Sequence, residues 1–223
     1  MKYLVIVAHP DDEVLGAGAS ISRLTREGNQ AAVATLVNHA AARHNLSSHL
    51  SEEQEKARAL LGVEKSYAAD FPNIKTNTVP HLELVQFVES CLKDYEPDIV
   101  ITHCPAETNI DHAMVSGAVQ AALRYPQRNE NAKPIRELWY MECASSTEWC
   151  VDSSANRFTP NLFVEVGEEG LNKKLEALSL YSGVMRPYPH PRSDEALRGL
   201  AAWRGAQAGC HYAEAFEAVF RRI

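Results

Sequence analysis

Short apolar segments alternate with longer amphipathic segments along most of this chain, and this alternation constrains the fold more than any other feature. The pattern predicts strands at residues 2–8, 31–36, 65–69, 98–102, 137–141 and 162–166. It predicts helices at residues 14–27, 51–61, 82–95, from about 111, at 168–181 and from 193 to 207. Strands that are separated by helices are joined by crossovers and run parallel, so we expect a three-layer α/β/α fold around a mostly parallel sheet.

Chain length and charge limit both the organisation and the partners. The 223 residues contain no internal repeat or linker, which predicts a single domain over residues 1–223. The 22 lysines and arginines against 29 acidic residues give a formal charge of -7, which disfavours nucleic acid and anionic lipid as partners. We expect a small-molecule substrate, and a homo-oligomer is compatible with this composition.

The first residues and the cysteines bear on the cellular compartment. Only about seven apolar residues precede the His-Pro-Asp-Asp-Glu run, too few for a membrane span or a secretory signal. The five cysteines are odd in number and form no Cys-x-x-Cys pair, which favours reduced thiols. We therefore expect a cytoplasmic protein without a membrane span.

Metal-binding residue types follow two of the predicted strands. In doubly wound sheets of order 3-2-1-4-5, the first and fourth strands are neighbours, and ligands bind at their carboxyl ends. The first strand is followed by His9, Asp11, Asp12 and Glu13, and the fourth leads to His103, Asp111 and His112. Residues about a hundred positions apart are thus predicted to meet at one edge of the sheet.

Two imidazoles and one carboxylate form a ligand set that suits catalytic zinc, because three protein ligands leave one position open. We assign these roles to His9, His112 and Asp12, and Pro10 helps to turn the chain between the first two ligands. Asp11 is then available as the base that activates a zinc-bound water. A purely structural interpretation is that the acids only favour the start of a helix, but it leaves His9 unexplained.

At these residues the sequence closely resembles the GlcNAc-phosphatidylinositol de-N-acetylase family, also called PIG-L or LmbE-like. The resemblance is nearly full length and includes AHPDDE at 8–13, FPNIKTNTVP at 71–80, ITHCPAETNIDH at 101–112 and SSTEW at 145–149. PHPRS at 189–193, RGAQAG at 204–209 and YAEAF at 212–216 are similar to bacterial sugar deacetylases of the family.

The resemblance implies a Rossmann-like fold and a hydrolase that removes the acetyl group from an N-acetylated amino sugar, such as a GlcNAc-like sugar or its conjugate. It implies one zinc per chain on His9, Asp12 and His112, with Asp11 as the general base. Asp111 would belong to the catalytic group as the acid that orients an imidazole or the substrate.

The sequence departs from the family pattern at several positions. Many members carry a histidine where this chain has Asn109, and that histidine is thought to stabilise the oxyanion of the tetrahedral intermediate. An amide can donate a hydrogen bond but carries no charge, so we nominate His190 as the catalytic replacement. Glu107, Asn73 and Ala113 also differ from the usual residues, which leaves the substrate open.

Four residues are candidates for substrate binding: Arg43, Asn109, Glu148 and Arg192. Arg43 lies in the loop at 38–50, which we interpret as a lid or substrate loop, and its guanidinium suits a phosphate or carboxylate. For Arg43 and Glu148 the structural alternative, a solvated side chain or ordinary packing near a strand end, has nearly equal weight.

Two other functions remain open from the sequence. The first is a noncatalytic metal- or sugar-binding module on the same fold, and the retention of Asp11 argues against it. The second is a metal-dependent phosphoesterase, which would usually need a second metal or more acids. Metal stoichiometry separates the two enzymes, because one zinc favours deacetylation and two favour phosphoester chemistry.

Overall fold

The computed structural model describes residues 1–38, 49–151 and 157–223, and it contains one sheet with the strand order β3-β2-β1-β4-β5-β7-β6. The strands are β1 Lys2–Val7, β2 Gln30–Thr35, β3 Lys65–Ala68, β4 Ile99–His103, β5 Glu137–Met141, β6 Leu162–Glu165 and β7 Ala213–Arg221. The first five strands in this order, β3, β2, β1, β4 and β5, run parallel to one another, whereas β7 is antiparallel to its neighbours β5 and β6. The expected mostly parallel sheet is confirmed, including the order 3-2-1-4-5.

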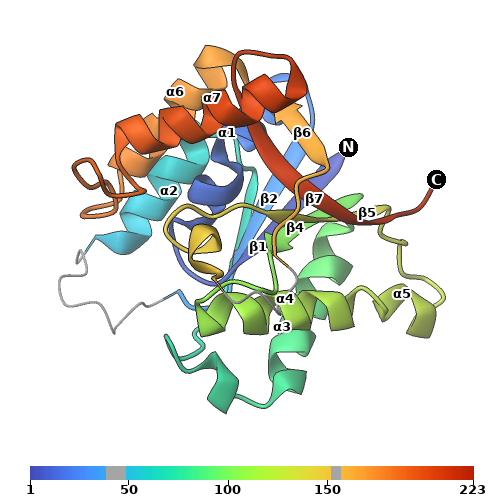
Figure 1. Ribbon diagram of the computed structural model, residues 1–223. Coiled ribbons are helices and arrows are strands. Elements are labelled where there is room, and N and C mark those ends of the chain that lie inside the picture. Colours follow the sequence, from blue (N-terminus) through green and yellow to red (C-terminus); the bar gives the residue numbers. More distant parts are fainter. Residues whose placement is uncertain (39–48, 152–156) are drawn as a thin grey trace.

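Helices cover both faces of the sheet (Figure 1). On one face lie α3 His81–Tyr95 and α4 Ile110–Ala122, and on the other lie α1 Asp12–Arg26, α2 Leu50–Leu60, α6 Gly167–Ser179 and α7 Asp194–Ala208. The short helix α5 Tyr125–Arg128 follows α4, and two 3₁₀ turns span Thr76–Thr78 and Thr147–Trp149. Alternate residues of β1 enter different cores, Val5 the core that includes α1 and Leu4 the core that includes α3 and α4. This explains the continuous apolar strands of the sequence.

The predicted elements agree with the structure to within a few residues, and Ser193 caps α7 by accepting a hydrogen bond from Ala196 N at 3.1 Å. Sequence analysis missed β7, which lies between β5 and β6. The residues from Ala213 to Phe216 are all buried, so no alternation marks them, and the strand is poor in β-branched residues.

The carboxyl ends of β1 and β4 lie side by side, because Ile6 is in register with Thr102. The turn after β1 leads into α1, and the loop after β4 leads into α4. Candidate ligands from both connections therefore reach the same edge of the sheet, as the sequence predicts. Among the described helices, none is long and apolar enough to cross a membrane.

Helix α1 is fixed against the sheet along its length. A Cβ atom at Gly16 would come within 2.3 Å of Met141 Sδ, so a larger residue there would have to displace the buried Met141 side chain. Further along, Lys174 and Glu214 form a buried ion pair, with Nζ and Oε1 2.6 Å apart. Lys174 donates to Leu15 O, and Glu214 accepts from the amides of Ala19 and Ser20, so the pair binds directly to the backbone of α1.

Candidate active site

The first two candidate ligands are joined in the turn that connects β1 to α1. Asp12 Oδ2 accepts a hydrogen bond from His9 N at 2.9 Å and lies 3.2 Å from His9 Nδ1. Both residues are buried, with exposed fractions of 3% for His9 and 1% for Asp12. The turn thus directs one imidazole nitrogen and one carboxylate oxygen at a common point.

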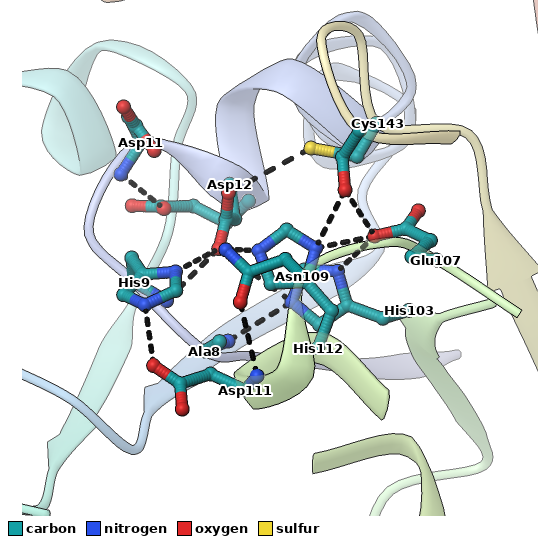
Figure 2. Close-up of polar contacts among 12 residues, drawn as sticks. Ala8, His9, Asp11, Asp12, His103, Glu107, Asn109, Asp111, His112 and Cys143 are labelled. Carbon is teal, nitrogen blue, oxygen red and sulfur yellow. Dashed lines mark hydrogen bonds and ion pairs between the residues drawn. The ribbon is translucent and has the colours of Figure 1, made fainter. Parts of the chain in front are cut away.

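The third candidate ligand comes from the first turn of α4. Asn109 caps this helix by accepting from Asp111 N at 2.9 Å, and His112 is the third residue of the helix. His112 Nε2 lies 3.2 Å from Asp12 Oδ2 and has no hydrogen-bond partner among the described residues. His9, Asp12 and His112 therefore offer three atoms within 4.8 Å of one another, as Figure 2 shows.

Each imidazole is held through its other nitrogen by a carboxylate. Asp111 Oδ2 lies 3.0 Å from His9 Nε2, and Glu107 is hydrogen-bonded to His112 Nδ1. Asp111 also accepts from the amides of Ile74 and Thr76 and from the Thr76 hydroxyl. Carboxylates in this position fix the ring orientation and the tautomer of metal-binding histidines, so the arrangement directs His9 Nδ1 and His112 Nε2 at Asp12.

Glu107 is a site residue that the sequence did not single out for this contact. Its carboxylate accepts hydrogen bonds from Ser146 at 3.1 Å and from Thr147 at 2.5 Å, both in the loop after β5. The same loop brings the buried Cys143 thiol to 3.6 Å from Asp12 Oδ1. In the sequence, only its position five residues before His112 could have indicated this contact. The contacts of Glu107 depend on the conformations of the loops after β4 and β5, which the sequence pattern does not predict.

His103 lies beneath the candidate ligands rather than among them. Its Nε2 accepts a hydrogen bond from Ala8 N at 2.9 Å, which makes that nitrogen the unprotonated one. The ring stacks on His112 with centroids 3.8 Å apart. Burial lowers the pKa of His103, and the neighbouring His112 charge lowers it further, so the ring is neutral.

The metal-free cluster holds alternating charges. Burial disfavours the charged form of every group here, but the charges of neighbouring side chains outweigh this effect. Asp12 and Glu107 raise the pKa of His112 to about 10. Asp111 and Asp12 raise the pKa of His9 to about 9. Burial raises the pKa of the two carboxyl groups, but the neighbouring imidazoles have the larger effect. They lower the pKa of Asp12 and lower the pKa of Glu107 to about 2. A divalent cation would therefore take the place of protons on two imidazoles.

Asp11 lies at the start of α1 in the left-handed conformation, with φ 97°. Its side chain does not cap the helix among the described backbone amides. Arg192 Nη1 instead donates to Asp11 Oδ2 at 3.0 Å, while Arg192 Nε donates to Ser145 Oγ at 2.6 Å. The structure thus brings Arg192 to Asp11 from the segment before α7, a contact that sequence reasoning did not foresee.

The other predicted residues lie around this cluster. His190 is exposed, and its Nδ1 accepts from Arg192 N at 3.0 Å. In Figure 2 the Asn109 side chain lies among the ligand residues, with its amide nitrogen turned toward Asp12. Glu148 is exposed and accepts from Ser145 N at 2.7 Å. Arg43 and most of the predicted lid at 38–50 lie outside the described residues.

Fold and site together define a class: a Rossmann-like α/β protein with a buried two-histidine, one-carboxylate cluster at the switch point of its sheet. The family model for PIG-L, GlcNAc-PI de-N-acetylase, matches residues 4–123, which contain this whole cluster. The chain belongs to this family.

Two curated relatives and one solved structure extend the comparison. YaiS of Escherichia coli K12, an uncharacterised deacetylase, is 30% identical over 78% of this chain and 87% of its own. Diacetylchitobiose deacetylase of Thermococcus kodakarensis is 24% identical over 96% of this chain and 81% of its own. The crystal structure of GalB, the 4-carboxy-2-hydroxymuconate hydratase of Pseudomonas putida KT2440, has a TM-score of 0.78, with 20% identity over 100% and 98% of the chains. The GalB likeness shows the fold alone.

Proposed function

We propose that this protein is a zinc-dependent N-deacetylase that hydrolyses the acetamide of an N-acetylated amino sugar or its conjugate. The observation that carries the proposal is the convergence of His9 Nδ1, His112 Nε2 and Asp12 Oδ2 beside Asp11. Family membership and the diacetylchitobiose deacetylase relative support the choice of reaction and substrate class.

The donor set fits a zinc ion. Tetrahedral zinc with bonds of about 2.0–2.1 Å separates its ligand atoms by about 3.3 Å. The distances from Asp12 Oδ2 to His9 Nδ1 and to His112 Nε2 are both 3.2 Å. His112 Nε2 is buried and faces Asp12 Oδ2 at 3.2 Å without a well-aligned hydrogen bond, so a zinc ion would take the place of the proton that this ring holds in the metal-free protein.

When bound, zinc would polarise the acetamide carbonyl and make a water molecule more acidic. The Asp11 carboxylate would take a proton from the attacking water as the water oxygen bonds to the carbonyl carbon. It would return that proton to the amide nitrogen as the C–N bond breaks, so that acetate and the free amino sugar leave. Arg192 would hold the carboxylate in place during both transfers.

The second described group of metal-binding residues, His103, Glu107 and His112, does not suit a second metal. It shares His112 with the first group. Because His103 Nε2 accepts from the Ala8 amide, the neutral ring carries its proton on Nδ1, the nitrogen that faces Glu107 at 3.6 Å, and this nitrogen has no lone pair to offer a metal. One ion per chain is therefore our proposal, which favours deacetylation over a two-metal phosphoesterase mechanism.

Two variants test the proposal. Asp11→Asn should keep about one zinc per chain and lose two to four orders of magnitude in deacetylation rate, because the amide cannot accept the water proton. His112→Ala should lose the metal, as measured by atomic emission after dialysis. If Asp11→Asn lost zinc while Asp12→Asn kept it, the roles of the two acids would be reversed. A zinc-loaded wild type that releases no acetate from any N-acetyl sugar would support the noncatalytic module.

A further inference from the structure

Glu13 is a buried carboxylate that the proposed reaction does not use. It lies in the first turn of α1 with an exposed fraction of 0%. An acid at this position ordinarily interacts with the helix dipole at the surface. Here the side chain is enclosed, so the cost of burying a charge must be met by specific partners.

Three donors from different parts of the fold meet at Glu13. Its Oε1 accepts from Arg58 Nε at 3.0 Å and from the Tyr181 hydroxyl at 2.9 Å. Its Oε2 accepts from the backbone amide of Asp11 at 3.1 Å. Arg58 in turn donates to Thr35 Oγ1 at 2.7 Å, and Arg58 and Tyr181 are both buried. The network thus joins α2, the segment just after α6 and the end of β2 to Asp11.

The backbone of Asp11 needs such support. A residue other than glycine is strained in the left-handed region, and such strain persists only where the surroundings hold it. Glu13 fixes the Asp11 amide, and Arg192 fixes the Asp11 carboxylate from the opposite end of the residue. The two contacts hold the peptide and the side chain independently.

We propose that Glu13, held by Arg58 and Tyr181, is a positioning residue that keeps Asp11 in its left-handed conformation and so aims the carboxylate at the reacting water. This inference rests on the proposed function of Asp11. Glu13 itself touches no candidate ligand side chain in the described contacts, so it acts on Asp11 rather than on the metal.

The test compares Glu13→Gln with Glu214→Gln. Both variants remove a buried carboxylate that pairs with a cation and accepts from backbone N–H groups. Glu13 accepts from Asp11, whereas Glu214 accepts from Ala19 and Ser20, away from the site. Glu13→Gln should lower kcat about 10- to 100-fold, with KM and the zinc dissociation constant nearly unchanged. Glu214→Gln should lose thermal stability and keep kcat at temperatures where it is folded. An equal loss of kcat in both variants would overturn the proposal.

A double-mutant cycle provides the second readout. If Glu13 acts through Asp11, Glu13→Gln should cause no further loss of rate in an Asp11→Asn background. An equal fractional loss in both backgrounds would overturn the proposal. If Glu13→Gln does not fold, Tyr181→Phe removes one of the three donors and should lower kcat several-fold in the same direction.

Hydrogen exchange at the Asp11 amide separates this inference from the proposed function. Exchange should be slow in wild type, fast in Glu13→Gln and slow in Glu214→Gln, whatever reaction the enzyme catalyses. That pattern in a protein without deacetylase activity would support the positioning role and refute the proposed function. Unchanged exchange in Glu13→Gln would overturn the positioning role.

Discussion

Replacing Glu107 with glutamine should weaken both the metal-free fold and the proposed zinc site. Imidazoles lower the pKa of this buried carboxyl group from 4.5 to about 2, despite the opposing effect of burial. At about 1.4 kcal/mol for each factor of ten, the difference corresponds to roughly 3 kcal/mol in favour of the charged form. Because the folded pKa is depressed, this stabilisation is present above pH 4.5 and is lost as the pH falls through about 2.

The neutral amide of Glu107→Gln imitates the protonated acid. Urea unfolding at pH 7 with a chelator present should therefore show a loss of about 3 kcal/mol in the free energy of unfolding. Zinc affinity should fall about 10- to 100-fold, because His112 loses the carboxylate that orients it. Glu55→Gln, at an exposed position on α2, is the matched control and should change stability by less than about 0.5 kcal/mol. A Glu107→Gln protein with wild-type stability and zinc affinity would refute the reasoning.

Three further outcomes are expected. Zinc binding at pH 7 should release about two protons, because His9 and His112 have raised pKa values in the metal-free protein. Calorimetry in buffers of different ionisation enthalpy measures the number of protons released, and no release would contradict the charge assignment. Glu214→Gln should destabilise the fold by about 3–5 kcal/mol in urea titrations, since it leaves Lys174 buried without its ion-pair partner. The double variant Lys174→Met with Glu214→Leu removes both charges and should regain much of this free energy of unfolding. His190 is expected to stabilise the oxyanion, so His190→Ala should lower kcat about 100-fold with KM little changed. Wild-type kcat in His190→Ala together with a lower kcat in Asn109→Ala would instead assign this role to the Asn109 side-chain amide.

The sequence predicted the features that follow from strand order. Alternating strands and helices place the ends of β1 and β4 together, and this is sufficient to bring His9 and Asp12 to His112. It does not predict contacts that depend on loop conformation. The pairing of Asp11 with Arg192 spans 181 residues of sequence, and no local pattern indicates it.

Strand β7 was missed for a different reason. Its first four residues, from Ala213 to Phe216, are all buried, so the alternation that identifies a half-exposed strand is absent. The substrate is also beyond the reach of sequence patterns, because side-chain contacts around the cluster decide it. The GalB likeness shows how different the chemistry of proteins with this fold can be.

The place of β7 in the sheet has a kinetic consequence. Its pairing with β5 joins segments that are distant along the chain, and such non-local pairings form slowly because loop closure must precede them. The loop that supplies Ser146 and Thr147 to Glu107 leaves directly from β5. We therefore expect the ligand cluster to assemble late in folding. Zinc added during refolding should change how stable the final state is, and not how fast the chain reaches it.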